Sequence, residues 1–204
     1  MMLYKYRFAF ANRLLAMPRS LAARHRLISA MSLALALYAS DALADWREAL
    51  PGANLIGEAD FRWYGFDVYH ARLWSTESKP SLDTPFALEL DYRRRISKQD
   101  LVETSLEEMQ RVTGTVQDAG RLEAWAAQMR GAFVDVQPGT RITGVYLPGQ
   151  GSRFYVDGRL SREIADTLFS RCFFSIWLDP RTRHPELRQR LLGLDTSNAK
   201  RSTP

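Results

Sequence analysis

The sequence predicts an α+β domain in residues 45–194, in which a layer of helices covers one side of a large antiparallel sheet. The expected elements come in the order strands, two helices, strands, two helices, and this segregation is typical of helices packed on an antiparallel sheet. Residues 86–93 alternate between apolar and polar side chains, which indicates a strand with one buried and one solvated face. Apolar side chains recur every three or four residues in later segments, which indicates amphipathic helices.

Residues 1–44 have the layout of an export signal. A basic stretch is followed by an apolar run at residues 27–39. This run is too short for the ~20 residues that span a bilayer, but it suits the core of a signal peptide. Small side chains at Ala42 and Ala44 predict cleavage after Ala44, a periplasmic or secreted product, and no membrane span in that product. An uncleaved anchor helix and a mitochondrial presequence are the alternatives, and Met17 is a second candidate start.

The first expected strands lie before residue 93. Residues 61–65 and 66–74 are rich in aromatic and β-branched side chains and have Gly65 between them, which indicates a long bent strand or a hairpin. The strand at residues 86–92 then places four apolar side chains on one face, because alternate residues point the same way. These side chains are Phe86, Leu88, Leu90 and Tyr92.

Two helices are expected next. Ser97 and Asp100 have the spacing of a capping box, which starts the first helix. Its stripe consists of Leu101, Ser105, Met109 and Val112. The second helix is predicted from about Asp118 to Phe133, because its apolar residues fall on one helical face. These residues are Leu122, Trp125, Ala126, Met129 and Phe133.

The second half repeats this order. Residues 141–147 and 152–156 flank a glycine-rich turn and predict a hairpin that ends at the Asp157-Gly158 turn. A third helix follows, with Cys172 on its wide apolar face, and it is expected to end at Asp179 before a proline. We expect the Cys172 thiol to be buried and unreactive. Pro185 starts a last short helix, which closes at a glycine, and residues 195–204 are expected to be a disordered tail.

Composition and charge exclude several classes of protein. The single cysteine excludes an intrachain disulfide, and 46% apolar with 11% aromatic residues argue against a disordered chain. Residues 1–44 hold six of the 28 basic and one of the 23 acidic side chains, so residues 45–204 hold 22 of each. Nucleic-acid binding is therefore not expected, and the run Arg93-Arg94-Arg95 is interpreted as a solvated strand end.

Motifs for metal, cofactor or nucleophilic chemistry are not found. His70, His184 and Cys172 lie far apart in the sequence, so no metal site is expected. No G-x-S-x-G elbow is present, and the glycines at 149 and 151 belong to a hairpin turn without a following helix to receive a phosphate. We therefore assign no catalytic residue and expect no cofactor.

Arginine and tyrosine side chains are the candidates for ligand binding. Arg62 and Tyr64 alternate on one strand, Arg153 and Tyr155 do the same on another, and Tyr146 is expected nearby. A guanidinium fork and a phenolic hydroxyl suit the carboxylate of a small apolar or amphiphilic ligand. Alternatively, these side chains lie on the solvated face and pair with acidic neighbours such as Glu58 or Asp60.

Four segments together resemble bacterial chalcone isomerase-like proteins. They are residues 66–74 (FDVYHARLW), 85–92 (PFALELDY), 144–156 (GVYLPGQGSRFYV) and 174–181 (FSIWLDPR). The resemblance covers nearly all of residues 50–193 and implies an open-faced β-sandwich of chalcone isomerase type, with a ligand cleft between sheet and helices. The wider fold family includes plant isomerases that close a flavanone ring and plastid relatives that bind fatty acids.

The catalytic pattern of the plant enzymes does not carry over to this chain. Their tyrosine and asparagine fall near Ser97 and Thr104, their early arginine has no counterpart in residues 51–54, and a late threonine falls near the apolar residues 174–177. The fold that the resemblance implies, the missing catalytic residue types and the available arginines and tyrosines together predict a non-catalytic protein that binds an apolar carboxylate such as a fatty acid, and residues 1–44 predict that it is exported. An isomerase acting on a small phenolic or enone is the alternative, and an interaction module that uses its sheet edge is a third interpretation.

Overall fold

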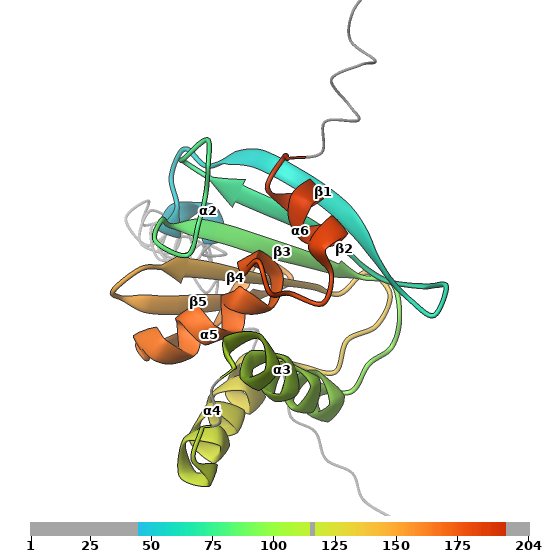
Figure 1. Ribbon diagram of the computed structural model, residues 1–204, viewed down its shortest axis with the longest axis vertical. Helices are drawn as coiled ribbons and strands as arrows, with labels where there is room; N and C mark the ends of the chain where they lie inside the picture. The colour runs from blue at the N-terminus through green and yellow to red at the C-terminus, as the bar shows by residue number, and fades with distance from the viewer. Residues whose placement is uncertain (1–44, 115–116, 195–204) are drawn as a thin grey trace, which may run out of the picture. The chain divides into compact units, whose positions relative to one another are not determined.

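The computed structural model describes residues 45–114 and 117–194 (Figure 1). The predicted leader, its cleavage after Ala44 and the predicted disordered tail lie outside these residues. Within them, no helix has the length and hydropathy that crossing a membrane requires.

The sheet of the described domain contains six antiparallel strands, and each strand pairs with the next one along the chain (Figure 1). The strands are β1 (Asn54–Trp63), β2 (Phe66–Ser75), β3 (Phe86–Tyr92), β4 (Arg141–Leu147), β5 (Gly151–Val156) and β6 (Arg159–Ile164). The first two segments form a hairpin, which decides between the two sequence-based alternatives. Strand β6 was not predicted from the sequence, because its first five residues are exposed and show no apolar alternation.

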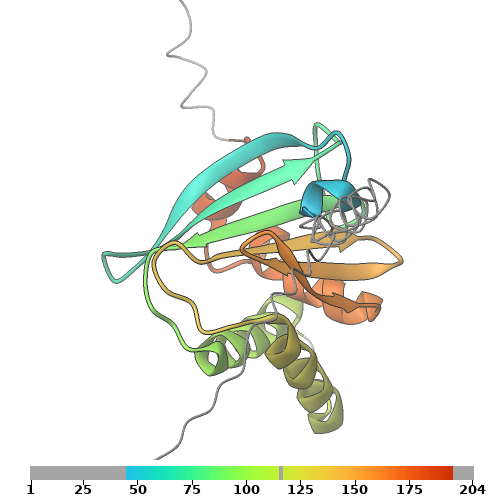
Figure 2. The same ribbon diagram turned by 180° about the vertical axis from the view of Figure 1, so that it is seen from behind.

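Four helices cover one face of this sheet, and a short helix lies on the other (Figures 1 and 2). The covering helices are α3 (Lys98–Thr113), α4 (Ala119–Ala132), α5 (Thr167–Leu178) and α6 (Pro185–Leu191). The short helix is α2 (Trp46–Ala49). This arrangement confirms the predicted α+β fold, an open antiparallel sheet with a helical layer.

Side-chain caps start α3 and α4 where the sequence predicts them, and a further cap starts α5. The Ser97 hydroxyl accepts a hydrogen bond from the Asp100 amide at 3.1 Å and donates to the Asp100 carboxylate at 2.6 Å. Asp118 caps α4 and Asp166 caps α5, each by accepting a backbone N–H three residues later. Such caps satisfy amides that the first helical turn leaves without partners.

The main core lies between the sheet and the helical layer. Phe86 and Leu88 of β3 pack there with aromatic side chains of α5, and Phe174 meets Phe86 edge to face at 5.2 Å between ring centroids. Cys172 belongs to the same core and is 6% exposed, as expected. Burial raises the pKa of its thiol.

The opposite face of the central strands is not solvated, so the expectation of a wet face on β3 is wrong. Trp46 and Leu50 pack against Ala87, Val145 and Tyr155 and form a second apolar cluster there. Glu89 is only 4% exposed, and its carboxylate pairs with Arg72 at 2.9 Å. The central strands are therefore buried on both faces.

A candidate ligand-binding cavity

A cavity of about 720 Å³ lies between the helix-covered face of the sheet and helices α3 and α5. This volume is within the ~300–1,000 Å³ of typical small-molecule sites. Apolar and aromatic side chains form most of its wall. The strands contribute Phe61, Val68, Leu88, Leu90, Ile142 and Phe154, and the helices contribute Leu101, Phe173, Phe174, Ile176 and Trp177.

Two tyrosines, the partly buried Tyr69 and the buried Tyr92, supply hydroxyl groups to this wall. The Tyr69 hydroxyl accepts a hydrogen bond from the Trp177 indole at 3.0 Å, and the rings of Tyr69 and Tyr92 meet edge to face at 5.8 Å. The Tyr92 hydroxyl has no hydrogen-bond partner among residues 45–114 and 117–194. Burial raises the pKa of both phenols, so at neutral pH they are hydrogen-bond donors and not bases.

Arg94 and Arg95 lie at the exposed rim of the cavity, just after β3. The Arg94 guanidinium stacks 4.5 Å from the centre of the Phe66 ring. Neither arginine forms an ion pair with any residue in the described ranges. Both can therefore accept an acidic ligand without breaking an existing ion pair.

The side of the rim formed by α3 carries carboxylates. Glu108 is held by Arg111 at 2.7 Å and by Arg183 at 3.0 Å, and Asp100 accepts a hydrogen bond from Ser97. Glu107 is exposed and also lines the cavity. The rim is thus divided, with cations at the β3 end and carboxylates on α3.

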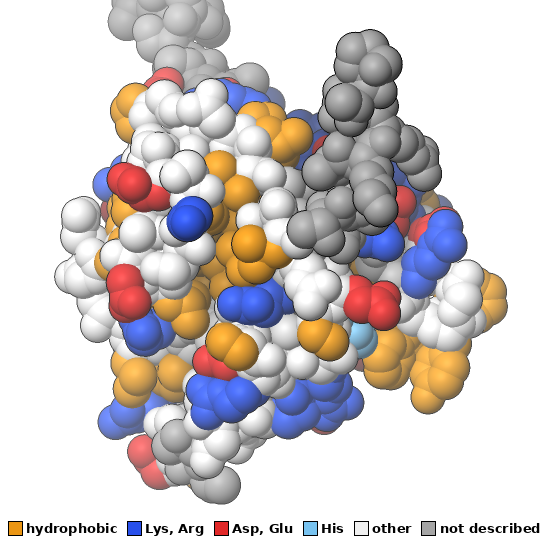
Figure 3. Space-filling view, turned by 45° about the horizontal axis from the view of Figure 1, so that its top comes forward, with side chains coloured by type: hydrophobic (Ala, Val, Ile, Leu, Met, Phe, Trp, Pro, Cys, Tyr) orange, Lys and Arg blue, Asp and Glu red, His pale blue; other side chains and the backbone are white. Residues whose placement is uncertain are grey.

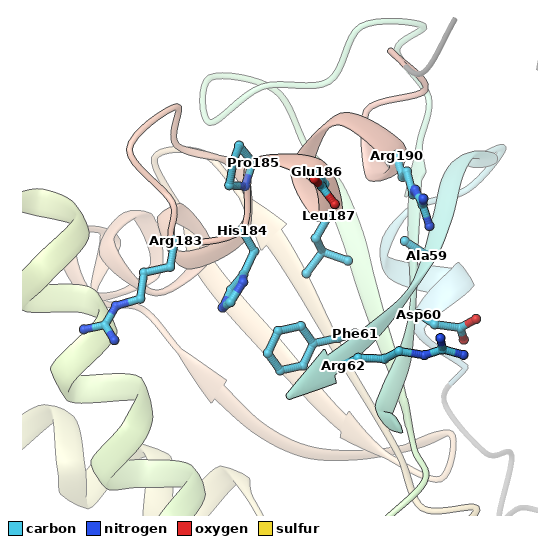
Figure 4. A pocket seen from close by; sticks show the side chains of 10 residues that line it. All are labelled: Ala59, Asp60, Phe61, Arg62, Arg183, His184, Pro185, Glu186, Leu187 and Arg190. Carbon is cyan, nitrogen blue, oxygen red and sulfur yellow. The ribbon is translucent and has the colours of Figure 1, made fainter. Parts of the chain in front are cut away.

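A smaller pocket of about 380 Å³ lies between β1 and α6 (Figure 4). It shares Phe61, Arg183 and His184 with the large cavity, so these residues form a common wall. Figure 4 shows Phe61 and His184 facing each other, with ring centroids 4.7 Å apart, while Asp60 extends from the other side of β1. Burial is the main cause that lowers the pKa of His184.

Only Tyr64 of the five predicted ligand-binding residues lines the large cavity. It occupies the turn after β1, so it does not share a strand face with Arg62 as expected. Arg62 pairs with Asp67 at 2.5 Å and lines only the smaller pocket, where Figure 4 shows it extending away from Phe61. The alternative in which Arg62 pairs with an acidic neighbour is therefore the one observed, but the partner is Asp67 and not Glu58 or Asp60.

The other three predicted residues do not meet at one site. Arg153 pairs with Glu163 at 2.9 Å, and Tyr155 is buried beneath α2, on the sheet face away from the cavity. Tyr146 points to the opposite face, where its hydroxyl donates to the Leu82 carbonyl at 2.9 Å. The grouping of Tyr146 with Tyr155 is therefore not realised, because their positions on β4 and β5 differ in side-chain direction.

Neither the rim arginines nor the two tyrosines of the cavity wall were predicted from the sequence as binding residues. Arg94 and Arg95 were visible as a basic run at the end of an expected strand, but a basic run alone does not indicate a cavity. Tyr69 and Tyr92 lie in segments that the analysis assigned to strands without a binding role. No local signal distinguishes a tyrosine that faces a cavity from one in a filled core.

Metal-ligating groups do not gather in the described part of the chain. No cluster of three or more histidine, cysteine, aspartate or glutamate side chains there has the arrangement that holds a metal ion. Both ring nitrogens of His70 contact carboxylates, Asp60 at 2.8 Å and Glu58 at 3.2 Å, on the sheet face away from the cavity.

Comparison with known proteins places the chain in a family. No curated protein matches the sequence significantly. Among solved structures, a fatty-acid binding protein of Arabidopsis thaliana is similar, with 11% identity, a TM-score of 0.54, and coverage of 70% of this chain and 88% of that one. This likeness shows the fold. The model of the family described as chalcone isomerase-like matches residues 59–193, well over half of the sequence. The chain therefore belongs to the chalcone isomerase-like family.

Proposed function

We propose that the protein is an exported, non-catalytic binding protein that holds a small apolar carboxylate, such as a fatty acid, in the large cavity. One observation carries this proposal. A largely apolar cavity of about 720 Å³ has two arginines at its rim that form no ion pair with the described residues. The signal-like residues 1–44 support export.

The apolar wall would bind the hydrocarbon part of the ligand. Burying one methylene group is favourable by about 0.8 kcal/mol, which corresponds to about a fourfold change in affinity. Leu90, Phe154 and Phe173 come from different elements and line the same space, so a flexible chain would contact them together. We therefore expect affinity to rise with chain length until the cavity is full.

The head group would lie at the β3 end of the rim. Arg94 and Arg95 offer forked donors that match a carboxylate, whereas Asp100 and Glu107 on α3 repel it. Arg94 is also oriented by its stacking on Phe66. This division of charge favours one orientation of the ligand, with its tail inside and its head near the arginines.

The comparisons support this proposal at the level of the fold. The family model is described as chalcone isomerase-like, and the similar Arabidopsis thaliana structure is named as a fatty-acid binding protein. The two phenols of the cavity wall are consistent with a non-catalytic role, since the raised pKa of Tyr69 and Tyr92 leaves little phenolate near neutral pH.

Native mass spectrometry of the exported protein, followed by thermal-shift titration with C12–C18 acids, tests the proposal. A ligand at 100 times its dissociation constant stabilises by about 2.7 kcal/mol, which raises Tm by about 5–10 °C for a domain of this size. Each pair of added methylenes should tighten binding about 15-fold until the cavity is full. The matching methyl esters should bind more weakly. The absence of both a co-purified lipid and a thermal shift would contradict the proposal.

A pair of variants on α3 locates the ligand. Ser105 lines the cavity and its hydroxyl bonds only to the Leu101 carbonyl one turn earlier, so Ser105→Phe fills the space without leaving a buried partner unsatisfied elsewhere. Glu103 lies on the same helix but does not line the cavity, which makes Glu103→Phe the matched control. Binding should be lost in the first variant and kept in the second. Equal affinity in both would place the ligand elsewhere.

An absorbance assay with chalcone distinguishes isomerase activity from the proposed binding role. Turnover equal to that of buffer between about pH 6 and 9 supports a binding role. Saturable turnover that Ser105→Phe abolishes would instead assign isomerase activity to the same cavity.

A further inference from the structure

We propose that the tip of the β1–β2 hairpin docks on an anionic phospholipid bilayer, with the rim of the large cavity facing the lipid. The docking surface consists of Trp63, Tyr64, Phe66, Arg94 and Arg95. All five residues line the cavity.

Three aromatic side chains of this surface, within four residues of the sequence, are unusually exposed. Trp63 is 46% exposed, Phe66 is 58% exposed and Tyr64 is 86% exposed. The hairpin projects beyond the rest of the sheet (Figures 1 and 2), and hydrophobic side chains gather at a projecting corner on the same side of the molecule in Figure 3. Tryptophan and tyrosine prefer the interface between water and bilayer, where an amphipathic ring is solvated on one side only.

The conformation of the hairpin turn provides no structural reason for a tyrosine at position 64. Tyr64 has φ +48° and Gly65 has φ +80°, so both central residues of this two-residue turn are left-handed. Such turns favour Asn-Gly or Asp-Gly, and a bulky side chain at the first position is strained. The only ring that Tyr64 contacts in the described ranges is that of Trp63, edge to face at 5.1 Å. Strain without compensating contacts points to a role outside the fold.

The positive charge of the docking surface favours an anionic bilayer as its partner. Arg94 stacks on Phe66 and lies beside Arg95, and neither has an ion-pair partner in the described ranges. The acidic neighbours on the hairpin are already engaged, since Asp67 pairs with Arg62 and Asp60 contacts His70. Arginines next to interfacial aromatic rings complement headgroup phosphates.

Docking in this way places the cavity rim against the source of an apolar ligand. A ligand leaving the bilayer would pass between Phe66 and Trp63 without crossing water. This consequence rests on the proposed function, whereas docking itself does not.

Vesicle flotation of the protein purified after export tests the docking surface. The vesicles are phosphatidylcholine alone, or phosphatidylcholine with about 30% phosphatidylglycerol. The first variant is Tyr64→Asn with Phe66→Thr, which removes two rings and places a turn-compatible residue at position 64. The second is Arg94→Gln with Arg95→Gln. The matched control, Arg159→Gln with Leu160→Thr, removes an exposed arginine and an exposed apolar side chain from the opposite edge strand, β6.

The wild type should float with the anionic vesicles and much less with the neutral ones. Each arginine neutralised should weaken partitioning about fivefold, and the aromatic variant should lose binding to both kinds of vesicle. The control should bind as the wild type does. Failure of the wild type to bind anionic vesicles overturns the proposal, as does an equal loss in the control. Self-association that depends on the tip, seen by sedimentation in place of vesicle binding, also overturns it.

Quenching by brominated phospholipids then locates the contact. Trp63 is the one exposed tryptophan among those in the described ranges, so vesicle binding should quench its fluorescence, and Trp63→Phe, compared at an equal amount of vesicle-bound protein, should abolish the quenching. Unchanged quenching in Trp63→Phe would refute contact through the tip. Vesicle binding by a protein that binds no fatty acid would refute only the proposed function, and fatty-acid binding without vesicle binding would refute only the docking.

Discussion

Replacing Gly57 by alanine tests the packing of α6 against β1, which encloses the smaller pocket. A Cβ at this position would lie 2.1 Å from the Arg190 carbonyl oxygen and 2.7 Å from that of Leu191. Ordinary carbon–oxygen contacts are about 3.3 Å or longer, so the end of α6 must retreat by about 1.2 Å. Leu191 is fully buried and would be displaced with the backbone. Overpacking typically destabilises by ~1–3 kcal/mol. We expect about 3 kcal/mol here, because the obstacle is backbone and not a flexible side chain.

Calorimetry and urea unfolding measure this effect. A loss of about 3 kcal/mol should lower Tm by about 6–12 °C for a domain of this size. Gly120→Ala on α4 is the control, because its Cβ meets only the Asp118 side chain at 3.2 Å, and alanine suits a helix better than glycine. A free energy of unfolding for Gly57→Ala within about 0.5 kcal/mol of the wild type would refute the close approach of α6 to β1.

Three further predictions concern single side chains. Cys172 should react with a thiol probe in denaturant and only slowly in native buffer, since it is 6% exposed, and rapid native labelling would contradict this packing. Glu89→Ala should lower the free energy of unfolding by about 2–3 kcal/mol, less than for a fully buried pair because the Arg72 side chain is 29% exposed, and a loss below about 0.5 kcal/mol would argue against the ion pair. The folded state lowers the pKa of His184, so the unfolded chain takes up this proton first as pH falls. Stability should therefore decrease as pH drops below about 6.5, and His184→Gln should remove that part of the decrease. An unchanged pH profile in the variant would assign the decrease to other groups.

Local signals in the sequence were sufficient for the four helices of the covering layer, but not for the short helix α2. The Ser97 and Asp118 caps act within one helical turn, so neighbouring residues decide where each helix starts. The turn at Asp157-Gly158 was also predictable, because glycine readily adopts the left-handed backbone conformation that such a turn requires. Gly158 does adopt this conformation, with φ +81°. Strand β6 follows that turn but was missed, since an exposed edge strand has no buried face to impose an apolar pattern.

The binding residues were harder to predict. The alternation of side chains along a strand shows which residues share a face, but it does not show which face borders the cavity. Arg153 and Tyr155 do share a face, as predicted, but it is the face covered by α2. Both sides of β3 and β4 are buried, so hydrophobicity does not distinguish them. The register shift between Phe61 and Arg62 further interrupts the simple alternation near the hairpin tip.

The sequence by itself determined the α+β class, the starts of α3, α4 and α6, the burial of Cys172 and the resemblance to the chalcone isomerase-like family. Only the tertiary structure decided that Tyr69, Tyr92 and Trp177 line one cavity and that Arg94 and Arg95 lie at its rim. The physical reason is the range of the interactions involved. Caps and turns depend on residues three or four positions apart, whereas a cavity is the space that strands and helices distant in sequence leave between them when they pack.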